Sequence, residues 1–533
     1  MGALRRRGAR AAANEPHNWH EMQDDSGLLM LTEHGQNGSR WDWYLTGDQV
    51  WPILVRRDGA RGRFAVAARP LSQGECVWSE EAYVHSVDAD YEDRVCHECY
   101  REITAQDRWH HCCDFCGRSL FCSAACHAAG ASNHAAECAV LRVIVERGDA
   151  ADVRAAHGMR LLMRCLVQAA AYPSQFSEVE EQLQEHYSDA PPDVRSSLEL
   201  LAHHVARLMP PSVQMEPSRV ARLVSRLNAN VIAIASADGV QLGSALYPQA
   251  ASRFNHSCAP NAVVSFVGSR LRLHLLEPVA AGSEVTISYT ELCEGRATRR
   301  GALLAAYAFS CRCSRCESPP ARDADLDGWC CAAAGCAGGI VPQAQDTCVR
   351  CGSAHALPAA SRDAIVRRWR ETLEQGAVGL VQCPTAPSCA PEPAVDNASE
   401  RARDAASKVL RESGGRLRED HALRLRARRL RVHALGALPC APTELVDALE
   451  ACVSDRERFR PRGHPAVAAY RRRLSSALFA HAAASGLDGN VSLAISLRDR
   501  ARAIAIEAAD DLAIGYGADH PTVSKWRREL DVT

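Results

Sequence analysis

The chain has 533 residues, too many for one compact core, so we expect several domains that together bury a large apolar surface. Its formal net charge of −2 at pH 7 favours neither nucleic acid nor a charged surface as a partner. No segment reaches the ~18 unbroken apolar residues of a membrane helix, so we expect no membrane association.

Cysteine and lysine are the informative residue types. The chain contains 24 cysteines, and its first residues show no apolar core of a secretory signal, which favours metal sites in a reducing compartment over disulfides. The basic start, MGALRRRGARAAAN, is interpreted as a solvated arm rather than a transit peptide. Lysine occurs only at Lys408 and Lys525, so almost every cation is arginine.

Periodicity predicts strands and then helices along the first half of the chain. Residues 1–50 are mixed and polar, whereas short apolar runs separated by glycine turns predict two or three strands within residues 53–78. Apolar residues at helical spacing predict helices over residues 139–228. After a Gly268-Ser269 turn, alternating residues predict a hairpin with one buried face, formed by Leu271, Leu273 and Leu275.

The C-terminal part contains a repeat. A Pro/Ala-rich passage, residues 383–397, separates one helix from the helices that follow. HPAVAAYRRRL at residues 464–474 is echoed by HPTVSKWRREL at residues 520–530. The repeat favours stacked helical hairpins, a common source of concave binding surfaces, and two similar core helices explain it equally well. One apolar helical stripe is formed by Val467, Tyr470, Leu474 and Leu478.

The cysteine spacing predicts structural zinc sites. Eight soft ligands lie within residues 96–138, enough for two tetrahedral ions with no open position for catalysis. They are Cys96, Cys99, Cys113, Cys116, Cys122, Cys126, His134 and Cys138, with Cys112 and His127 as alternatives to Cys113 and His134. A second group, Cys311, Cys313 and Cys316, lacks a fourth ligand, which Cys258 could supply.

A ribbon-like group completes the set. Its spacing, Cys-x4-Cys followed by Cys-x2-Cys, predicts a further structural zinc and brings the total to about four per chain. The residues are Cys331, Cys336, Cys348 and Cys351, with Cys330 as an alternative to Cys331. Three other cysteines, Cys76, Cys165 and Cys293, are interpreted as core residues.

Four segments in this order resemble one known family. They are RGRFAVAARPLSQGE at residues 61–75, NHSCAPN at 255–261, GSEVTISY at 282–289 and CRCSRC at 311–316. Together they resemble the SET and MYND domain (SMYD) lysine methyltransferases, and the cluster at residues 96–138 resembles the MYND finger. In that pattern, one zinc takes Cys96, Cys99, Cys122 and Cys126, and the other takes Cys113, Cys116, His134 and Cys138.

The resemblance implies an α+β fold. A β-rich SET domain is split by a MYND zinc finger and followed by a post-SET zinc segment, a zinc ribbon-like insert and a TPR-like α-helical C-terminal domain. The implied divisions are an N-terminal extension (1–50), the first SET part (51–95), the finger (96–138), a helical SET insert (139–228), the SET core (229–295), the post-SET segment (296–318), the ribbon (325–356) and the helical domain (357–533).

The resemblance also implies a site for S-adenosyl-L-methionine and a lysine. Tyr289 is the expected catalytic residue, with Tyr307 as a wall of the lysine channel. The expected cofactor residues are Arg61, Arg63, Asn230, Asn255, His256, Tyr289 and Phe309, with Asn228 as a competitor of Asn230. Phe64 departs from the pattern, because the family has a glycine there, and phenylalanine does not share the backbone freedom of glycine.

These features favour a protein-lysine N-methyltransferase that acts on a histone or non-histone protein. The alternative is a catalytically weak chromatin or transcription adaptor of the corepressor type, and Phe64 favours it. MYND fingers imply a peptide partner, often proline-rich, and in some members nucleic acid, which leaves direct nucleic-acid binding open here. We expect a monomer located in nucleus and cytoplasm.

Overall fold

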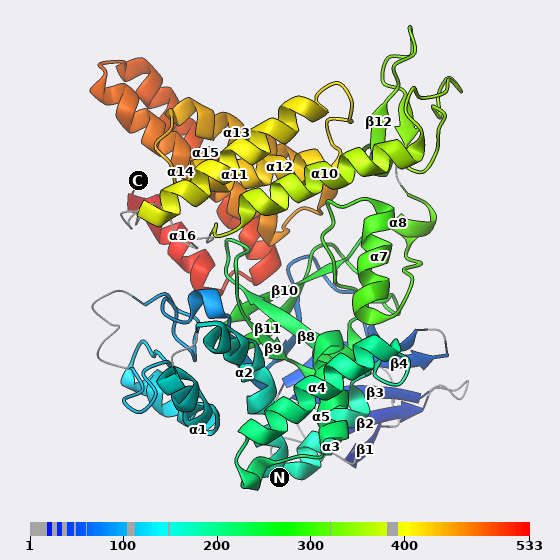
Figure 1. Ribbon diagram of the computed structural model, residues 1–533, viewed down its shortest axis with the longest axis vertical. Helices are drawn as coiled ribbons and strands as arrows, with labels where there is room; N and C mark the ends of the chain where they lie inside the picture. Colours follow the sequence, from blue (N-terminus) through cyan, green and yellow to red (C-terminus); the bar gives the residue numbers. More distant parts are fainter. Residues whose placement is uncertain are drawn as a thin grey trace.

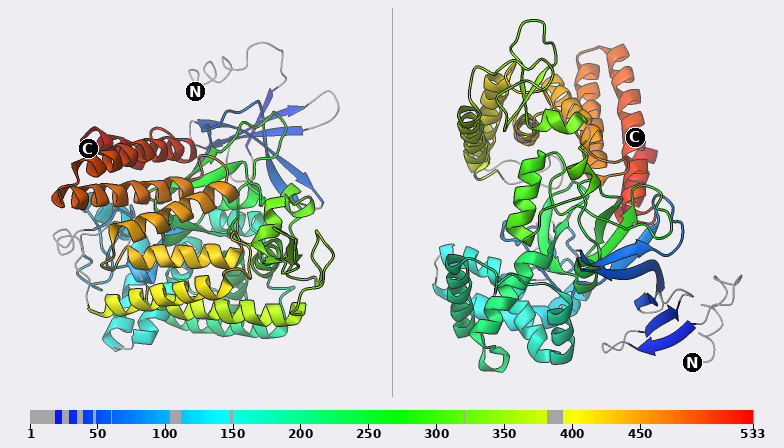
Figure 2. Two further views of the ribbon diagram at one scale, coloured as in Figure 1. Left: turned by 90° about the horizontal axis from the view of Figure 1, so that it is seen from above. Right: turned by 90° about the vertical axis from the view of Figure 1, so that its right-hand side faces the viewer.

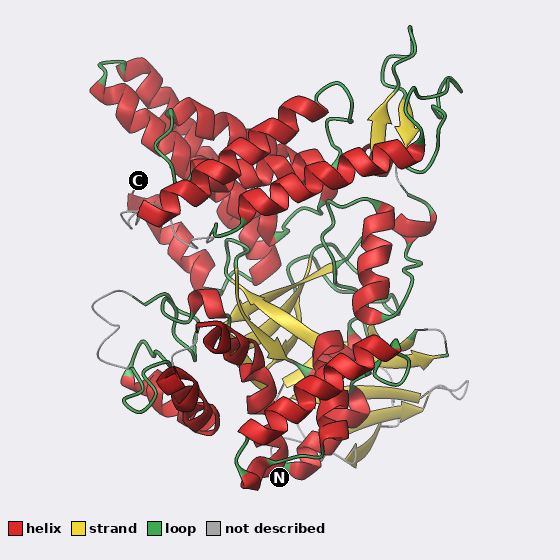
Figure 3. Cartoon of the chain, viewed as in Figure 1, coloured by secondary structure: helices red, strands yellow, loops and turns green. Residues whose placement is uncertain are grey.

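The structure is a computed structural model that describes residues 19–23, 29–34, 40–46, 49–59, 61–103, 112–147, 150–319, 321–380 and 393–532. The predicted arm, residues 1–14, and most of the Pro/Ala-rich passage, residues 383–392, lie outside the described residues. The predicted α+β class is confirmed, because a β-rich centre is covered by helices above and below (Figure 3).

Small antiparallel sheets build the centre of the molecule. The strand orders are β1-β2-β3-β4-β5, β10-β11-β6 and β7-β9-β8. Strands β4, β5 and β6 are the ones predicted within residues 53–78, whereas β1 to β3 arise from the polar segment, for which no strand was predicted. The bounds are β1 Trp19–Gln23, β2 Leu29–His34, β3 Arg40–Thr46, β4 Gln49–Asp58, β5 Gly62–Ala67, β6 Cys76–Glu80, β7 Val84–Val87, β8 Val231–Ala235, β9 Gln241–Leu246, β10 Ala262–Val267 and β11 Arg270–Leu275.

The hairpin β10–β11 turns at Gly268-Ser269 as predicted. Its three leucines are fully buried, but His274 on the opposite face is also buried, with 1% of its surface exposed. The second face is covered because α15 (Val491–Tyr516) packs on β10 and β11 and Gly517 lies against the His274 ring. The prediction of one buried face is therefore wrong for this strand.

Helices lie below the sheets, between the finger and β8. The first begins inside the finger, and the others enclose a second apolar core. Several start with proline, whose fixed φ suits the first helical position. The bounds are α1 Ala124–Arg147, α2 Ala150–Ala171, α3 Pro173–Gln182, α4 Pro192–Leu208 and α5 Pro217–Asn230, with short 3-10 turns η3 Ala89–Tyr91 and η4 Pro211–Val213.

The ribbon projects from the upper part of the molecule beside α10 (Figure 1). Its two strands are β12 (Gly328–Cys330) and β13 (Ile340–Pro342), and Trp329 stacks on Trp369 of α10 with ring centroids 6.3 Å apart. Arg362 is fully buried and donates to the carbonyls of Pro342, the last residue of β13, and of Gln343. Before the ribbon lie α6 Pro248–Arg253, α7 Arg296–Tyr307, α8 Ser314–Glu317 and α9 Ala321–Leu326.

The C-terminal helices pack one after another above the sheets (Figure 2). The repeated His-Pro pair starts α14 and α16, where His464 and His520 each accept a backbone N–H through Nδ1. His421 caps α12 in the same way. The repeat is thus a helix-start signal. The bounds are α10 Ala359–Ala377, α11 Pro393–Ser413, α12 Ala422–Leu435, α13 Pro442–Phe459, α14 Pro465–Leu487, α15 Val491–Tyr516 and α16 Pro521–Val532.

The predicted stripe on α14 is buried, with at most 5% of Val467, Tyr470, Leu474 and Leu478 exposed. Tyr470, Leu474 and Leu478 form one core with residues of α12, α13 and α15, so consecutive helices share side chains as stacked hairpins do. None of the described helices combines the length and the apolar character needed to cross a membrane.

Candidate functional site

Two segments that are distant in sequence lie side by side at the centre of the site. Ser257 N–H donates to the carbonyl of Ile287 at 2.9 Å, and Ile287 N–H donates to the carbonyl of Asn255 at 3.0 Å. His256 and Ile287 form a parallel bridge. The NHSCAPN segment is therefore held against the backbone that leads to Tyr289.

Tyr289 lies within a group of aromatic rings. Its ring centroid is 5.0 Å from that of Tyr307 and 5.5 Å from that of His256, and both neighbours approach Phe309 at 6.4 and 6.2 Å. The Tyr289 hydroxyl donates to the carbonyl of Phe254 at 2.6 Å. Burial raises the pKa of Tyr289, so the hydroxyl is a fixed, neutral dipole near pH 7.

His256 connects this tyrosine to a metal group. Its Nδ1 accepts the backbone N–H of Tyr289 at 2.9 Å, so in the neutral ring the proton is assigned to Nε2. Nε2 then donates to Cys258 Sγ at 3.2 Å. Burial lowers the pKa of His256 to about 4, which keeps the ring neutral. The imidazole thus links the backbone of Tyr289 to the thiol of Cys258.

Glu284 links the start of β5 to the NHSCAPN segment. It accepts from the Arg61 guanidinium at 2.8 Å and from Asn255 Nδ2 at 3.3 Å, and Asn255 also donates to the carbonyl of Arg63 at 3.2 Å. The Arg61 side chain is 52% exposed, so its ion pairs with Asp58 and Glu284 contribute little to stability. Their effect is to orient the carboxylate.

Arg63 and Asn230 meet at the end of α3. The Arg63 guanidinium donates to the carbonyl of Gln182. Asn230 Nδ2 donates to the carbonyls of Gln184 and Arg226 at 2.8 and 2.7 Å. The structure thus brings Asn255, His256, Tyr289, Tyr307 and Phe309 into one group, while Arg63 and Asn230 are joined through residues 182–184.

Phe64 occupies an ordinary strand position. It pairs with Arg56 in the β4–β5 ladder, and its side chain lies in a small core with Leu54 and Val66. The Arg61 guanidinium lies 4.1 Å from the centre of its ring. The backbone freedom of glycine is required instead at Gly62, whose φ is +70°. Phenylalanine therefore fits position 64 without strain.

An open cavity of about 750 Å³ lies beside β8. It is lined by residues of α2, α4 and α5 and of the sheet β7-β9-β8, and Asn228 is among them. Asn228 is exposed, whereas Asn230 is half-buried at the end of the same helix.

The predicted cysteine and histidine ligands converge in four groups. In each group the ligand atoms lie within 4.8 Å of one another, which is close enough to hold a metal ion. Thiolate and imidazole donors in sets of four fit tetrahedral zinc. The groups are Cys96, Cys99, Cys122 and Cys126; Cys113, Cys116, His134 and Cys138; Cys258, Cys311, Cys313 and Cys316; and Cys331, Cys336, Cys348 and Cys351.

The alternative ligands lie outside these groups. Cys112 forms a bridge with Leu120, and the His127 ring packs on Phe121 at 5.1 Å. Cys330 belongs to β12. Of the three cysteines interpreted as core residues, Cys165 is fully buried, and Cys76 and Cys293 are partly buried at the edges of apolar clusters.

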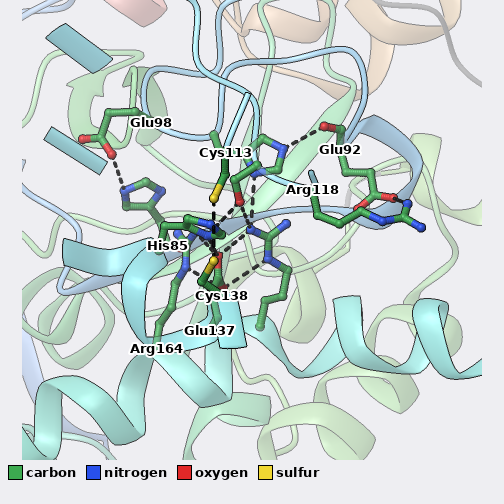
Figure 4. A network of polar contacts seen from close by, with 12 residues as sticks. His85, Glu92, Glu98, Cys113, Arg118, Glu137, Cys138 and Arg164 are labelled. Atoms are coloured by element: carbon green, nitrogen blue, oxygen red, sulfur yellow. Dashed lines mark hydrogen bonds and ion pairs between the residues drawn. The ribbon is translucent and has the colours of Figure 1, made fainter. Parts of the chain in front are cut away.

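A buried carboxylate anchors the finger to α2. Glu137 accepts from the guanidinium groups of Arg160 and Arg164, and its Oε1 lies 3.2 Å from His134 Nδ1. Figure 4 shows Glu137 and Arg164 within this network of polar contacts. Burial alone would raise the pKa of Glu137, but the charges of Arg164 and Arg160 hold it well below its usual value. Arg164 also donates to the carbonyl of His85 on β7. A carboxylate behind a ligand histidine orients the ring for a metal.

Two buried arginines surround the group around Cys258. Arg315 donates to the carbonyl of Cys258 at 3.0 Å and to Asp323, which also accepts from Arg299 at 3.0 Å. Arg299 has no exposed surface. Because four thiolates around a dication carry a net negative charge, nearby guanidinium groups favour metal loading.

Sequence reasoning missed these supporting residues. Glu137 follows His134 by three positions in a helix, so the two share a face, and this spacing was an available signal. Glu284 lies within the GSEVTISY motif. Arg160, Arg164 and Arg299 gave no local signal, because the groups that they pair with are distant in sequence.

The chain contains a SET domain. The family model described as "SET domain" matches residues 62–290. The match begins in β5 and ends directly after Tyr289, and it includes the finger and the helices of the insert.

Within this class, the chain is related to SMYD3 and SMYD2. It is 27% identical over 274 residues to histone-lysine N-methyltransferase SMYD3 of Mus musculus, a match that covers 50% of this chain and 61% of the relative. It is 25% identical to SMYD3 of Homo sapiens, a match that covers 52% of this chain and 64% of the relative. It is 24% identical to N-lysine methyltransferase SMYD2 of Homo sapiens, a match that covers 48% of this chain and 58% of the relative. The match thus spans less than two thirds of each relative.

Proposed function

We propose that the chain is an S-adenosylmethionine-dependent protein-lysine N-methyltransferase acting on histone or non-histone proteins. The observation that carries the proposal is the setting of Tyr289, whose hydroxyl bonds the Phe254 carbonyl beside Tyr307, His256 and Phe309. The relation to proteins named lysine methyltransferases supports it.

Methyl transfer needs a neutral amine aligned with the methyl group. The lysine side chain has a pKa of ~10.4, so deprotonating it at pH 7.4 costs about 4 kcal/mol. A channel walled by Tyr289 and Tyr307 would favour the neutral amine by removing water from it. A neutral hydroxyl and the carbonyl of Phe254 can orient that amine without adding a charge.

The cofactor would be held beside the same aromatic group. We assign this role to Asn255, His256 and Phe309, with Tyr289 between cofactor and lysine, and with Arg61, Arg63 and Asn230 at the margin. S-adenosylmethionine supplies an activated methyl group on a sulfonium centre. The chain's part is to orient the amine, exclude water and keep further charges away from it.

The four ligand groups would hold zinc in structural roles. Each offers four soft donors, which leaves no open position. The group of Cys258 would fix the post-SET segment, and with it Tyr307 and Phe309, against the NHSCAPN segment. Metal analysis of purified protein should give about four zinc ions per chain. A value of two zinc ions per chain would show that the groups of Cys258 and Cys331 are not zinc sites.

The experiment is transfer of tritium from labelled S-adenosylmethionine to an array of histone and other lysine peptides. Wild-type protein should label a subset of the peptides, and Tyr289→Phe should lose most of the signal because the amine loses its hydroxyl partner. Tyr172→Phe is the matched control, since Tyr172 is 52% exposed on the insert. Equal labelling by both variants would contradict the role of Tyr289.

A corepressor-type adaptor is the second candidate. Its support is the exposed finger surface, where Phe115 is 55% exposed with the Arg142 guanidinium 4.4 Å from its ring centre. A proline-rich peptide is the partner that such a surface would take. Calorimetry separates the candidates, because an adaptor without enzymatic function need not bind S-adenosylmethionine. We place the protein in nucleus and cytoplasm, which imaging of a tagged chain would test.

A further inference from the structure

The cavity behind β8 has an apolar floor. Its volume of about 750 Å³ is large enough for a long side chain. Leu162 of α2, Leu201 of α4 and Leu227 of α5 contribute to the floor, and Val231 of β8 continues it. Such a surface suits an aliphatic stem.

Another part of the lining, the acidic wall, contains Asp88 and Asp90. The described lining residues include no lysine, arginine or histidine. Asp88 accepts from Gln241 Nε2 at 2.7 Å and from Ser244 Oγ at 3.5 Å, both neutral donors. Burial raises the pKa of Asp88, and the charge of Asp90 acts in the same direction. A cation in the cavity would relieve both effects.

The cavity adjoins the proposed reaction site through shared elements. Helix α5 lines the cavity and ends at Asn230, and β8 begins with Val231, which also lines it. The same helix contacts α7, which ends at Tyr307. The cavity and the proposed reaction site therefore share the junction of α5 and β8, where Asn230 and the lining residue Val231 are consecutive.

We propose that this cavity binds an arginine side chain of the acceptor protein, close in sequence to the lysine that is methylated. The proposal rests on the proposed methyltransferase function and adds the chemical class of the acceptor. The stem would cover the apolar floor while the guanidinium pairs with Asp88 and Asp90. Arginine is favoured over lysine because its planar fork bonds a carboxylate through two N–H groups.

The test uses peptides with one central lysine in an alanine background. Arginine, glutamine or glutamate is placed at each flanking position in turn, and initial rates are measured with tritiated S-adenosylmethionine. At one or two positions, arginine should exceed glutamine by about five- to tenfold, the effect of a partly buried charge pair. Glutamate should be poorer than glutamine. Anisotropy with the central lysine replaced by methionine should show the same order in binding.

Two variants test the assignment to the acidic wall. Asp88→Asn keeps the shape and should reduce the arginine-to-glutamine ratio to about one. Asp90→Asn, at an exposed position, should reduce the ratio in part and serves as a second variant if the first does not fold. Asp488→Asn, at the exposed end of α14, is the control that should keep both the activity and the ratio.

The outcomes separate this inference from the function on which it rests. If no peptide is methylated and S-adenosylmethionine does not bind, the proposed function fails and the inference fails with it. If peptides are methylated without preference for arginine, the function stands and the inference is overturned. A preference that survives in both Asp88→Asn and Asp90→Asn overturns it as well.

Discussion

Glu137→Gln removes the buried charge that joins the finger to α2 while keeping the shape of the side chain. Glu137 is fully buried, and the side chains of Arg160 and Arg164 are 0% and 4% exposed. The substitution leaves two buried guanidinium groups without their counter-charge. Breaking a buried ion pair in this way costs about 3–5 kcal/mol. The loss should appear as opening of the finger and α2.

Hydrogen exchange measures this opening where it occurs. Each ~1.4 kcal/mol of lost stability changes the opening equilibrium by about a factor of ten. A loss of about 3 kcal/mol should therefore make backbone amides exchange roughly a hundredfold faster in the finger and in α2 near Arg160. Release of zinc to a chelator should accelerate too, since the acceptor of His134 loses its negative charge.

Glu450→Gln is the matched control. Its partner Arg500 has a side chain 50% exposed, so the pair is worth at most about 1 kcal/mol and exchange should change by about fivefold or less. A Glu137→Gln protein that exchanges no faster than the Glu450→Gln control would refute the reasoning.

Three further results are expected. His256→Ala should spare zinc content but reduce methyl transfer, whereas Cys258→Ser should reduce both, as metal analysis beside the tritium assay would show. Burial lowers the pKa of His421 to about 3, so between pH ~6.5 and 3 the unfolded chain binds a proton that the folded chain does not. Acid should therefore destabilise the fold in this pH range. The variant His421→Asn keeps a helix cap and should show a smaller fall in melting temperature between these pH values. A variant with Lys408→Arg and Lys525→Arg should carry no methyl group on lysine after incubation with labelled cofactor, and any such methyl found by mass spectrometry would be inconsistent with the sequence.

The metal groups were largely predictable because most of their ligands lie a few residues apart in the sequence. Pairs such as Cys96 with Cys99 place two thiols at one ion, and the resemblance to the MYND finger supplied the division of the pairs between two ions. The choices between Cys112 and Cys113 and between His127 and His134 needed the fold. Cys258 lies more than fifty residues from Cys311, and the NHSCAPN motif suggested their meeting.

Burial by distant parts of the chain was not predictable. His274 alternates with leucines as a surface residue would, and the packing of α15 on the hairpin, with Gly517 against the His274 ring, excludes water. Strands β1 to β3 lie in a polar segment whose pattern gave no strand signal. The comparison with the family glycine suggested that a phenylalanine at position 64 would not fit. The side chain of Phe64 instead packs with its neighbours Leu54 and Val66 in a small core.

The most direct test of the central claim is the site of labelling on a peptide methylated by purified, zinc-loaded protein. The account predicts that the methyl group from S-adenosylmethionine is found on a lysine side chain, and that Tyr289→Phe removes most of it while S-adenosylmethionine still binds. Protein that fails to bind S-adenosylmethionine in calorimetry, or that transfers no methyl group to any lysine, would contradict the account.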